Sequence, residues 1–147
     1  MTGRVLAPLT EDEFDTLVSI AIRRAELLDD VGSPLAIDAW HEVMVYEEQL
    51  AEITRADDIA GGVARVGAIS AALAAGQSRD AKRLARKYLE EDHFPSERQL
   101  AIKRAFDENY ERLTRRFPAL ARSGYLTELD DWRSSASAHP HVFPWAA

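Results

Sequence analysis

Apolar residues recur at helical spacing along most of this chain, in segments separated by glycine, proline or short polar stretches. In the first segment they lie three or four positions apart, which places them on one face of a helix. Thr10 precedes this segment as an N-cap, and Glu13 lies three residues on, the spacing of a capping box. We therefore expect a helix that begins after Thr10 and ends at residues 31–34. Its apolar face consists of Phe14, Leu17, Val18, Ala21, Ala25 and Leu28.

The second segment is apolar over a wider surface. Residues 39–46 are apolar on more than one side of a helix, and the pattern becomes acidic and amphipathic from Glu47 onward. A helix that is apolar on several sides contacts more than one neighbour. We therefore expect a helix from Leu35 to about Thr54 that is central to the fold and packs on two sides.

Residues 58–91 predict two helices that fold back on one another at residues 76–78, and we expect this hairpin at the centre of the fold. Its first helix holds Gly61, Gly62 and Gly67, although glycine costs about 1 kcal/mol relative to alanine inside a helix. Such glycines are retained where another part of the chain approaches the backbone closely. The lysine and hydroxyl residue of a phosphate loop do not follow Gly67, so close packing is the better interpretation.

The spacing from Gly76 to Ala81 resembles part of a tetratricopeptide-type hairpin. The resemblance covers one hairpin, and no second copy follows at that repeat's period of about 34 residues. The repeat's signature aromatic and glycine positions in the first helix are occupied by other residues, namely Arg65, Ala68, Ile69 and Ala72. We therefore assign no family on this spacing.

A fifth helix is expected from Ser96 to near Arg116, before the next proline. The periodic pattern then weakens, with a short helix expected at residues 127–133. Residues 134–147 contain two prolines and no periodicity, so we expect them to be extended. The chain as a whole predicts an all-α, single-domain bundle of about five main helices with a central αα-hairpin, comprising a helical domain at residues 1–133 and the extended aromatic tail.

The composition is that of a folded soluble chain, with 46% hydrophobic and 29% charged residues among 147. Cysteine is absent, which excludes disulfides, thiolate metal sites and cysteine nucleophiles. No apolar run is long enough to cross a bilayer, and the first residues do not have the pattern of a signal peptide. We therefore expect no membrane partner and a cytoplasmic location.

The net charge of −7 is distributed unevenly along the chain. Residues 1–58 hold 14 acidic and 4 basic side chains, whereas residues 59–147 hold 11 acidic and 14 basic ones. We expect the acidic half to pack beside the basic half, and the alternative is a charged partner. Nucleic acid is not expected as a partner, because most of the molecule would repel phosphate.

The types of polar residue in the chain suggest two kinds of chemistry, metal ligation and nucleophilic catalysis. Glu90 and His93 have the i, i+3 spacing of di-iron bundles, and Asp38 and His41 repeat it, but a complete site also needs carboxylates from two other helices. Residues 139–141 hold two histidines in the tail, where a preorganised site is not expected. No serine lies in a Gly-x-Ser-x-Gly elbow. We predict no catalytic residue, no metal ligand and no cofactor.

Two aromatic residues of the tail, Phe143 and Trp145, have no periodic partner. Burying a large apolar side chain contributes roughly 1.5 to 3 kcal/mol, so these residues are expected either to dock on their own domain or to contact another chain. We take both as candidate partner-binding residues.

These features together favour a small, acidic, cytoplasmic helical protein-interaction module, such as an adaptor, an immunity-type inhibitor or an antitoxin, with no catalysis of its own. The expected partner is a protein, and self-association into a homo-oligomer is one form of such binding. One alternative is a cofactor- or metal-binding helical bundle enzyme that uses the interior around Trp40, His41 and Glu47. The other is a structural subunit of a larger assembly.

Overall fold

The structure, a computed structural model, describes residues 9–116; residues 1–8 and 117–147 lie outside the described part. Every regular element in the described part is an α-helix, which confirms the predicted all-α bundle. The short helix expected at residues 127–133 and the tail at 134–147 fall outside this range. The described helices are α1 (Glu11–Asp30), α2 (Ala36–Glu52), α3 (Ile59–Ala74), α4 (Ser78–Leu89) and α5 (Ser96–Arg116).

Local sequence signals set several of the helix ends. The Glu13 amide donates to the Thr10 hydroxyl and the Thr10 amide donates to the Glu13 carboxylate, each at 3.2 Å, so the predicted capping box forms. Helix α2 begins at Ala36, one residue later than expected, and the Ser33 hydroxyl accepts a hydrogen bond from the Leu35 amide in the turn before it. At the other end of α3, Gly76 has a φ of 71°, the left-handed conformation predicted for this C-terminal position.

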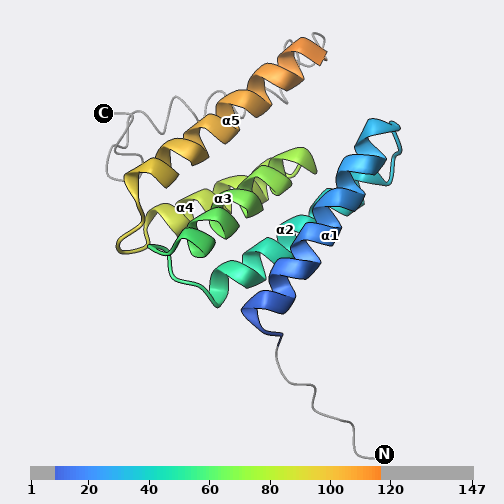
Figure 1. Ribbon diagram of the computed structural model, residues 1–147. Coiled ribbons are helices and arrows are strands. Elements are labelled where there is room, and N and C mark those ends of the chain that lie inside the picture. Colours follow the sequence, from blue (N-terminus) through green and yellow to red (C-terminus); the bar gives the residue numbers. More distant parts are fainter. Residues whose placement is uncertain (1–8, 117–147) are drawn as a thin grey trace, which may run out of the picture.

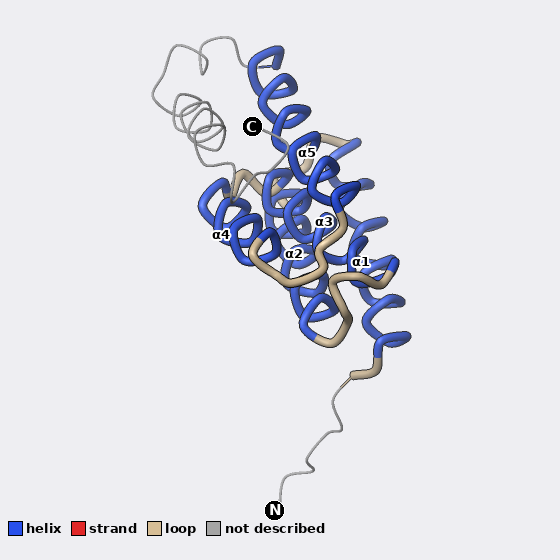
Figure 2. The backbone as a smooth tube through the Cα atoms, turned by 90° about the vertical axis from the view of Figure 1, so that its left-hand side faces the viewer, coloured by secondary structure: helices blue, strands red, loops and turns tan. Residues whose placement is uncertain are grey.

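Helix α3 is the centre of the arrangement. Its most extensive contacts are with α2, α4 and α5, and α1 packs mainly against α2 (Figure 1). Figure 2 shows the same order from the side, with α4 and α1 at opposite margins and α3 between them. Since α3 and α4 contact each other, the predicted central hairpin is present. Of its two helices, α3 has the more extensive contacts with the other helices.

Small residues let α3 hold three neighbours at short range. Six of its nine buried residues are alanine or glycine. At Gly61 an added Cβ would lie 1.8 Å from the Arg55 carbonyl oxygen. No side chain fits at that distance, so the loop before α3 requires glycine here. The prediction that the glycines allow close approach is confirmed, and at Gly67 the approaching group is the side chain of Glu47 rather than a helix backbone.

The acidic half of the chain packs beside the basic half, as expected from the charge distribution. Arg83 of α4 lies 2.9 Å from Glu48 of α2, and Lys87 forms ion pairs with Glu48 and Glu52. These pairs are partly exposed, and each contributes little to stability on its own. Together they align α4 along α2. No helix among residues 9–116 combines the length and the apolar character needed to cross a membrane.

Candidate functional site

A buried arginine ties α3 to the end of α4. The side chain of Arg65 is 5% exposed and makes a bidentate ion pair with Glu91, at 2.8 and 2.9 Å. It also donates to the carbonyl oxygens of Thr54, at 3.1 Å, and Gly61, at 2.9 Å. Glu91 lies just after α4, at a helix end where the dipole disfavours acids, and this contact neutralises it. Because the guanidinium is saturated by the fold itself, we assign it a structural role.

A crevice of about 310 Å³ lies beside this network, and it contains the histidine of the predicted i, i+3 pair. His93 has a φ of 64°, a left-handed conformation that is uncommon for residues other than glycine. Both Glu90 and His93 are exposed. Within residues 9–116, no three His, Asp or Glu side chains are grouped so as to hold a metal ion. The two histidines at positions 139 and 141 lie outside the described residues.

The three interior residues of the enzyme alternative, Trp40, His41 and Glu47, each make a separate contact. The Trp40 indole donates to the Asp29 carboxylate of α1 at 3.1 Å. The His41 ring lies 2.7 Å from the Gln77 side chain, between α3 and α4. Glu47 lies further along α2, against Gly67. The structure therefore does not bring these three residues of α2 together around one centre.

Glu47 is a buried acid in the interface between α2 and α3. The residue is 4% exposed, and one of its carboxylate oxygens lies 2.5 Å from the position that a Cβ on Gly67 would occupy. Within residues 9–116 its side chain has no ion pair or hydrogen bond. Burial, with a smaller effect from the charge of Asp15, raises the pKa of the Glu47 carboxyl to about 7. The group is thus close to half protonated at neutral pH.

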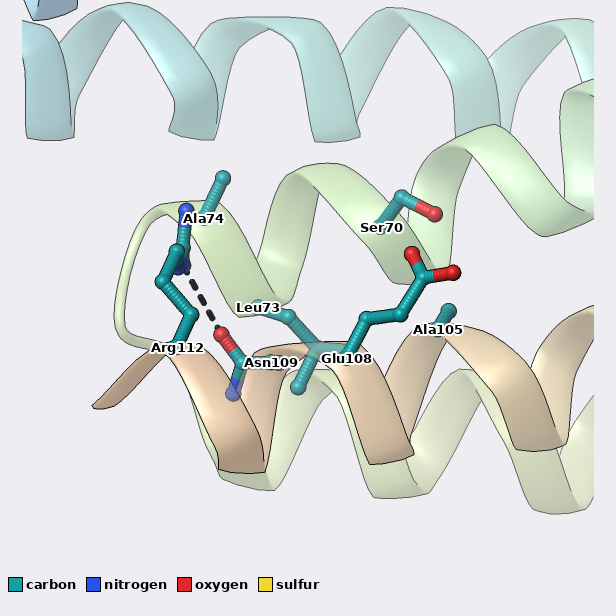
Figure 3. Close-up of a pocket in the computed structure, with 7 residues that line it drawn as sticks. All are labelled: Ser70, Leu73, Ala74, Ala105, Glu108, Asn109 and Arg112. Atoms are coloured by element: carbon teal, nitrogen blue, oxygen red, sulfur yellow. Dashed lines mark hydrogen bonds between the residues drawn. The ribbon is translucent and has the colours of Figure 1, made fainter. Parts of the chain in front are cut away.

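A small pocket lies between the second halves of α3 and α5 (Figure 3). The Glu108 carboxylate and the Ser70 hydroxyl lie at one end of it, and Arg112 lies at the other. Arg112 donates to the side-chain oxygen of the buried Asn109 at 2.8 Å. The pocket volume of about 220 Å³ is below the range of about 300–1,000 Å³ that is usual for small-molecule sites.

The outer side of α1 carries large apolar side chains that are exposed to solvent. Ile20 is 62% exposed, Leu27 is 59% exposed and Val31, which follows the helix, is 77% exposed. Two shallow hollows, of about 440 and 550 Å³, flank this part of α1, and both are lined by Arg23 and Leu27. Contiguous exposed apolar side chains are typical of protein or membrane contact sites and of ligand grooves.

Helix α1 in fact carries two apolar stripes, each with steps of three and four residues. The inner stripe packs on α2 and consists of Phe14, Val18, Ala21, Ala25 and Leu28. The outer stripe has the same spacing, is interrupted by one arginine, and consists of Leu17, Ile20, Arg24, Leu27 and Val31. Steps of three and four are those of a helix that pairs with another helix along its length.

The sequence contained a signal for the outer stripe that the prediction did not use. The predicted apolar face includes Leu17 and does not include Ile20, Leu27 or Val31. A search for a second stripe at the same spacing would have found them. The predicted partner-binding residues Phe143 and Trp145 lie outside the described part of the chain and remain predictions.

No family model, curated protein or solved structure matches this chain. The geometry of the outer stripe is therefore the basis for inferring a function.

Proposed function

We propose that this chain is a protein-interaction module of the adaptor, immunity-inhibitor or antitoxin kind, with no catalysis of its own and with a cytoplasmic location. The single observation that carries the proposal is the outer stripe of α1. Its exposed apolar residues follow helix-pairing spacing, on a helix whose other side is already packed against α2.

The contacts of the buried polar residues favour recognition over chemistry. Arg65 is held by Glu91 and by backbone carbonyls, and Asn109 is held by Arg112. These two contacts position helices rather than a reacting group. The tail residues Phe143 and Trp145 would add a second contact to the partner.

Cross-linking in the native cell tests the proposal. A photoreactive amino acid placed at Leu27 is expected to join the chain to a protein, because this side chain lies at the middle of the outer stripe and is exposed. The matched control has the same photoreactive residue at Ile59, which is 79% exposed but lies on α3. The expected result is a discrete protein adduct from position 27 that is weak or absent from position 59.

A measurement of the native mass can contradict this proposal. If the chain purified from its own cell has the mass of a monomer, gives no adduct at position 27 and retains a stoichiometric small molecule, the interaction proposal is wrong. The cofactor-binding bundle would then be the better explanation.

A further inference from the structure

Helix α4 carries five basic side chains and one acidic one, and the bases divide between two sides of the helix. Arg83 and Lys87 lie against α2, where they pair with Glu48 and Glu52. The other three bases lie three and four residues apart, so they share a second side of the helix. We refer to these three residues as the basic side of α4: Arg79, Lys82 and Arg86.

The basic side has few acids to balance it. Arg79 and Arg86 are exposed, and neither has a hydrogen bond or an ion pair within residues 9–116. Glu90 follows Arg86 by one turn, so three bases share this side with one acid. Like charges one turn apart destabilise a helix, so acidic groups bound here would stabilise α4. The basic side is therefore suited to an acidic segment.

The chain leaves α5 near the beginning of α4. Helices α3 and α5 run in the same direction, because Arg98 lies close to Gly62 near their starts and Arg112 lies beside Ala74 at the end of α3 (Figure 3). Arg112 is one turn before the last residue of α5, and α4 begins four residues after Ala74. Residues 117–147 therefore start from the end of the bundle at which α4 begins.

This C-terminal segment holds negative charge in one short run. Its three acidic side chains all lie within the helix predicted at residues 127–133, and they are Glu128, Asp130 and Asp131. In a helix, Glu128 and Asp131 are one turn apart on the same side, with Trp132 next to them, whereas Asp130 lies on another side. Two acids at this spacing match the spacing of the three bases on α4.

A short tether favours this segment over other acidic partners. Eleven residues connect Arg116 to Glu128, a reach of up to roughly 36 Å, whereas the twelve residues of α4 span about 18 Å. Such a tether raises the effective concentration of the segment to the millimolar range, an advantage that a second copy of the chain lacks. The acidic α1 of the same molecule lies at the opposite margin (Figure 2). Nucleic acid would be repelled by the net charge of −7.

We propose that residues 127–133 dock in cis as a helix on the basic side of α4, with Glu128 and Asp131 beside the three bases. Trp132 packs on the aliphatic parts of those bases and on Leu89, which is partly buried and continues the spacing of the basic side. This contact is independent of the outer stripe of α1. It ties the beginning of the aromatic tail to the margin of the molecule opposite α1.

Zero-length cross-linking of the full-length chain with a carbodiimide tests the contact, because the reagent joins a lysine amine to a carboxylate that touches it. We expect a link from Lys82 to Glu128 or Asp131. The ion pair between Lys87 and Glu52 is the internal positive control. Mixing unlabelled chain with chain labelled with ¹⁵N distinguishes a link within one molecule, which is expected, from a link between two molecules.

Hydrogen exchange measures the docking itself. Amides of residues 127–133 are expected to exchange at least about tenfold more slowly than in an unfolded chain, and to lose part of this protection at high salt. The double variant Arg79→Glu/Arg86→Glu is expected to abolish the protection. The matched control is Arg23→Glu/Arg104→Glu, which reverses two exposed arginines on α1 and α5 and is expected to retain it.

A charge swap separates docking from a general loss of structure. Adding Glu128→Lys/Asp131→Lys to Arg79→Glu/Arg86→Glu restores opposite charges, so the protection of residues 127–133 is expected to return. Adding Asp130→Lys instead is expected to leave the protection lost, because Asp130 lies on another side of the predicted helix. Arg79 and Arg86 are exposed, so these variants should fold, and circular dichroism checks this.

Four outcomes would overturn this proposal. Residues 127–133 could exchange as fast as an unfolded chain, or Arg23→Glu/Arg104→Glu could remove their protection as fully as Arg79→Glu/Arg86→Glu. The charge swap could fail to restore the protection. Lys82 could give no link to the segment while the link between Lys87 and Glu52 forms, and links of Lys82 that join two molecules only would assign the basic side to a second copy instead.

Discussion

Replacing Glu47 by glutamine is expected to remove a pH dependence of stability that the wild-type chain shows between about pH 4.5 and pH 7. The carboxyl is buried between α2 and α3, and its pKa in the folded chain is about 7, against an ordinary value of 4.5. The charged group that raises this pKa from a neighbouring helix is Asp15 of α1. Gly67, which contacts the carboxylate from α3, has no side chain to neutralise it.

The sign of the effect follows from proton binding. The folded chain holds a proton at Glu47 up to about pH 7, whereas the unfolded chain releases it near pH 4.5. The stability that this proton confers is fully present below pH 4.5 and is lost as the pH rises through 7. One pKa unit corresponds to about 1.4 kcal/mol, so the shift corresponds to a loss of about 3 kcal/mol across this window.

The measurement is urea denaturation of the wild-type chain and of Glu47→Gln at constant ionic strength from pH 4 to pH 9. Glutamine has the shape of the protonated acid and does not titrate. The variant should therefore match the wild type at low pH and exceed it increasingly up to pH 8. Taking the difference between the two proteins removes the contribution of other carboxyls, such as Glu48, whose pKa is lowered by Arg83.

Two further variants sharpen the test. Asp15→Asn removes a neighbouring negative charge, so it should lower the pKa of Glu47 and reduce the loss of stability. Glu111→Gln changes an exposed glutamate on α5 and should leave the pH profile unchanged. A difference between wild type and Glu47→Gln that stays constant from pH 4 to pH 9 would refute the reasoning.

Three other predictions concern packing and helix ends. Gly67→Ala should destabilise the chain by up to about 2 kcal/mol in urea denaturation, because its Cβ would lie 2.5 Å from a carboxylate oxygen of Glu47 and the gain in helix propensity of about 1 kcal/mol offsets only part of this overpacking, whereas Ser70→Ala should have little effect. Arg65→Met should cost about 3 kcal/mol, since it leaves a partly buried carboxylate and two carbonyls without their donor; Arg24→Met breaks an exposed pair and should change little, and equal effects would contradict the structural role of the buried arginine. Thr10→Ala should cost about 1 kcal/mol and fray the start of α1, which amide hydrogen exchange would detect as lost protection in the first turn; unchanged protection there would contradict the role of the cap.

Local patterns were sufficient to predict the helices. The capping box at Thr10 and Glu13, the left-handed glycine at Gly76 and the spacing of apolar residues act within a few residues of chain. They therefore predict the helix ends locally, to within about two residues. The pairing of the acidic half with the basic half was also predictable, because it follows from the sum of many charges.

The contacts that form the candidate sites could not be predicted from these local patterns. Helical spacing states which residues share a face, but it does not state which face a neighbour covers. The outer stripe of α1 has the same spacing as the inner stripe, and only the packing of α2 against the inner one leaves Ile20 and Leu27 in solvent.

The sequence by itself determined an all-α chain, its helix boundaries and the need for close approach at the glycines of α3, because these depend on backbone conformation and local hydrogen bonds. Tertiary structure alone decided that Arg65 is neutralised by Glu91, 26 residues away, and that the carboxylate of Glu47 lies against Gly67 without a partner in the described part of the chain. Burial and charge pairing depend on which helices meet, and those meetings join residues far apart in the sequence. The pKa of Glu47 and the exposure of the outer stripe are both consequences of that packing.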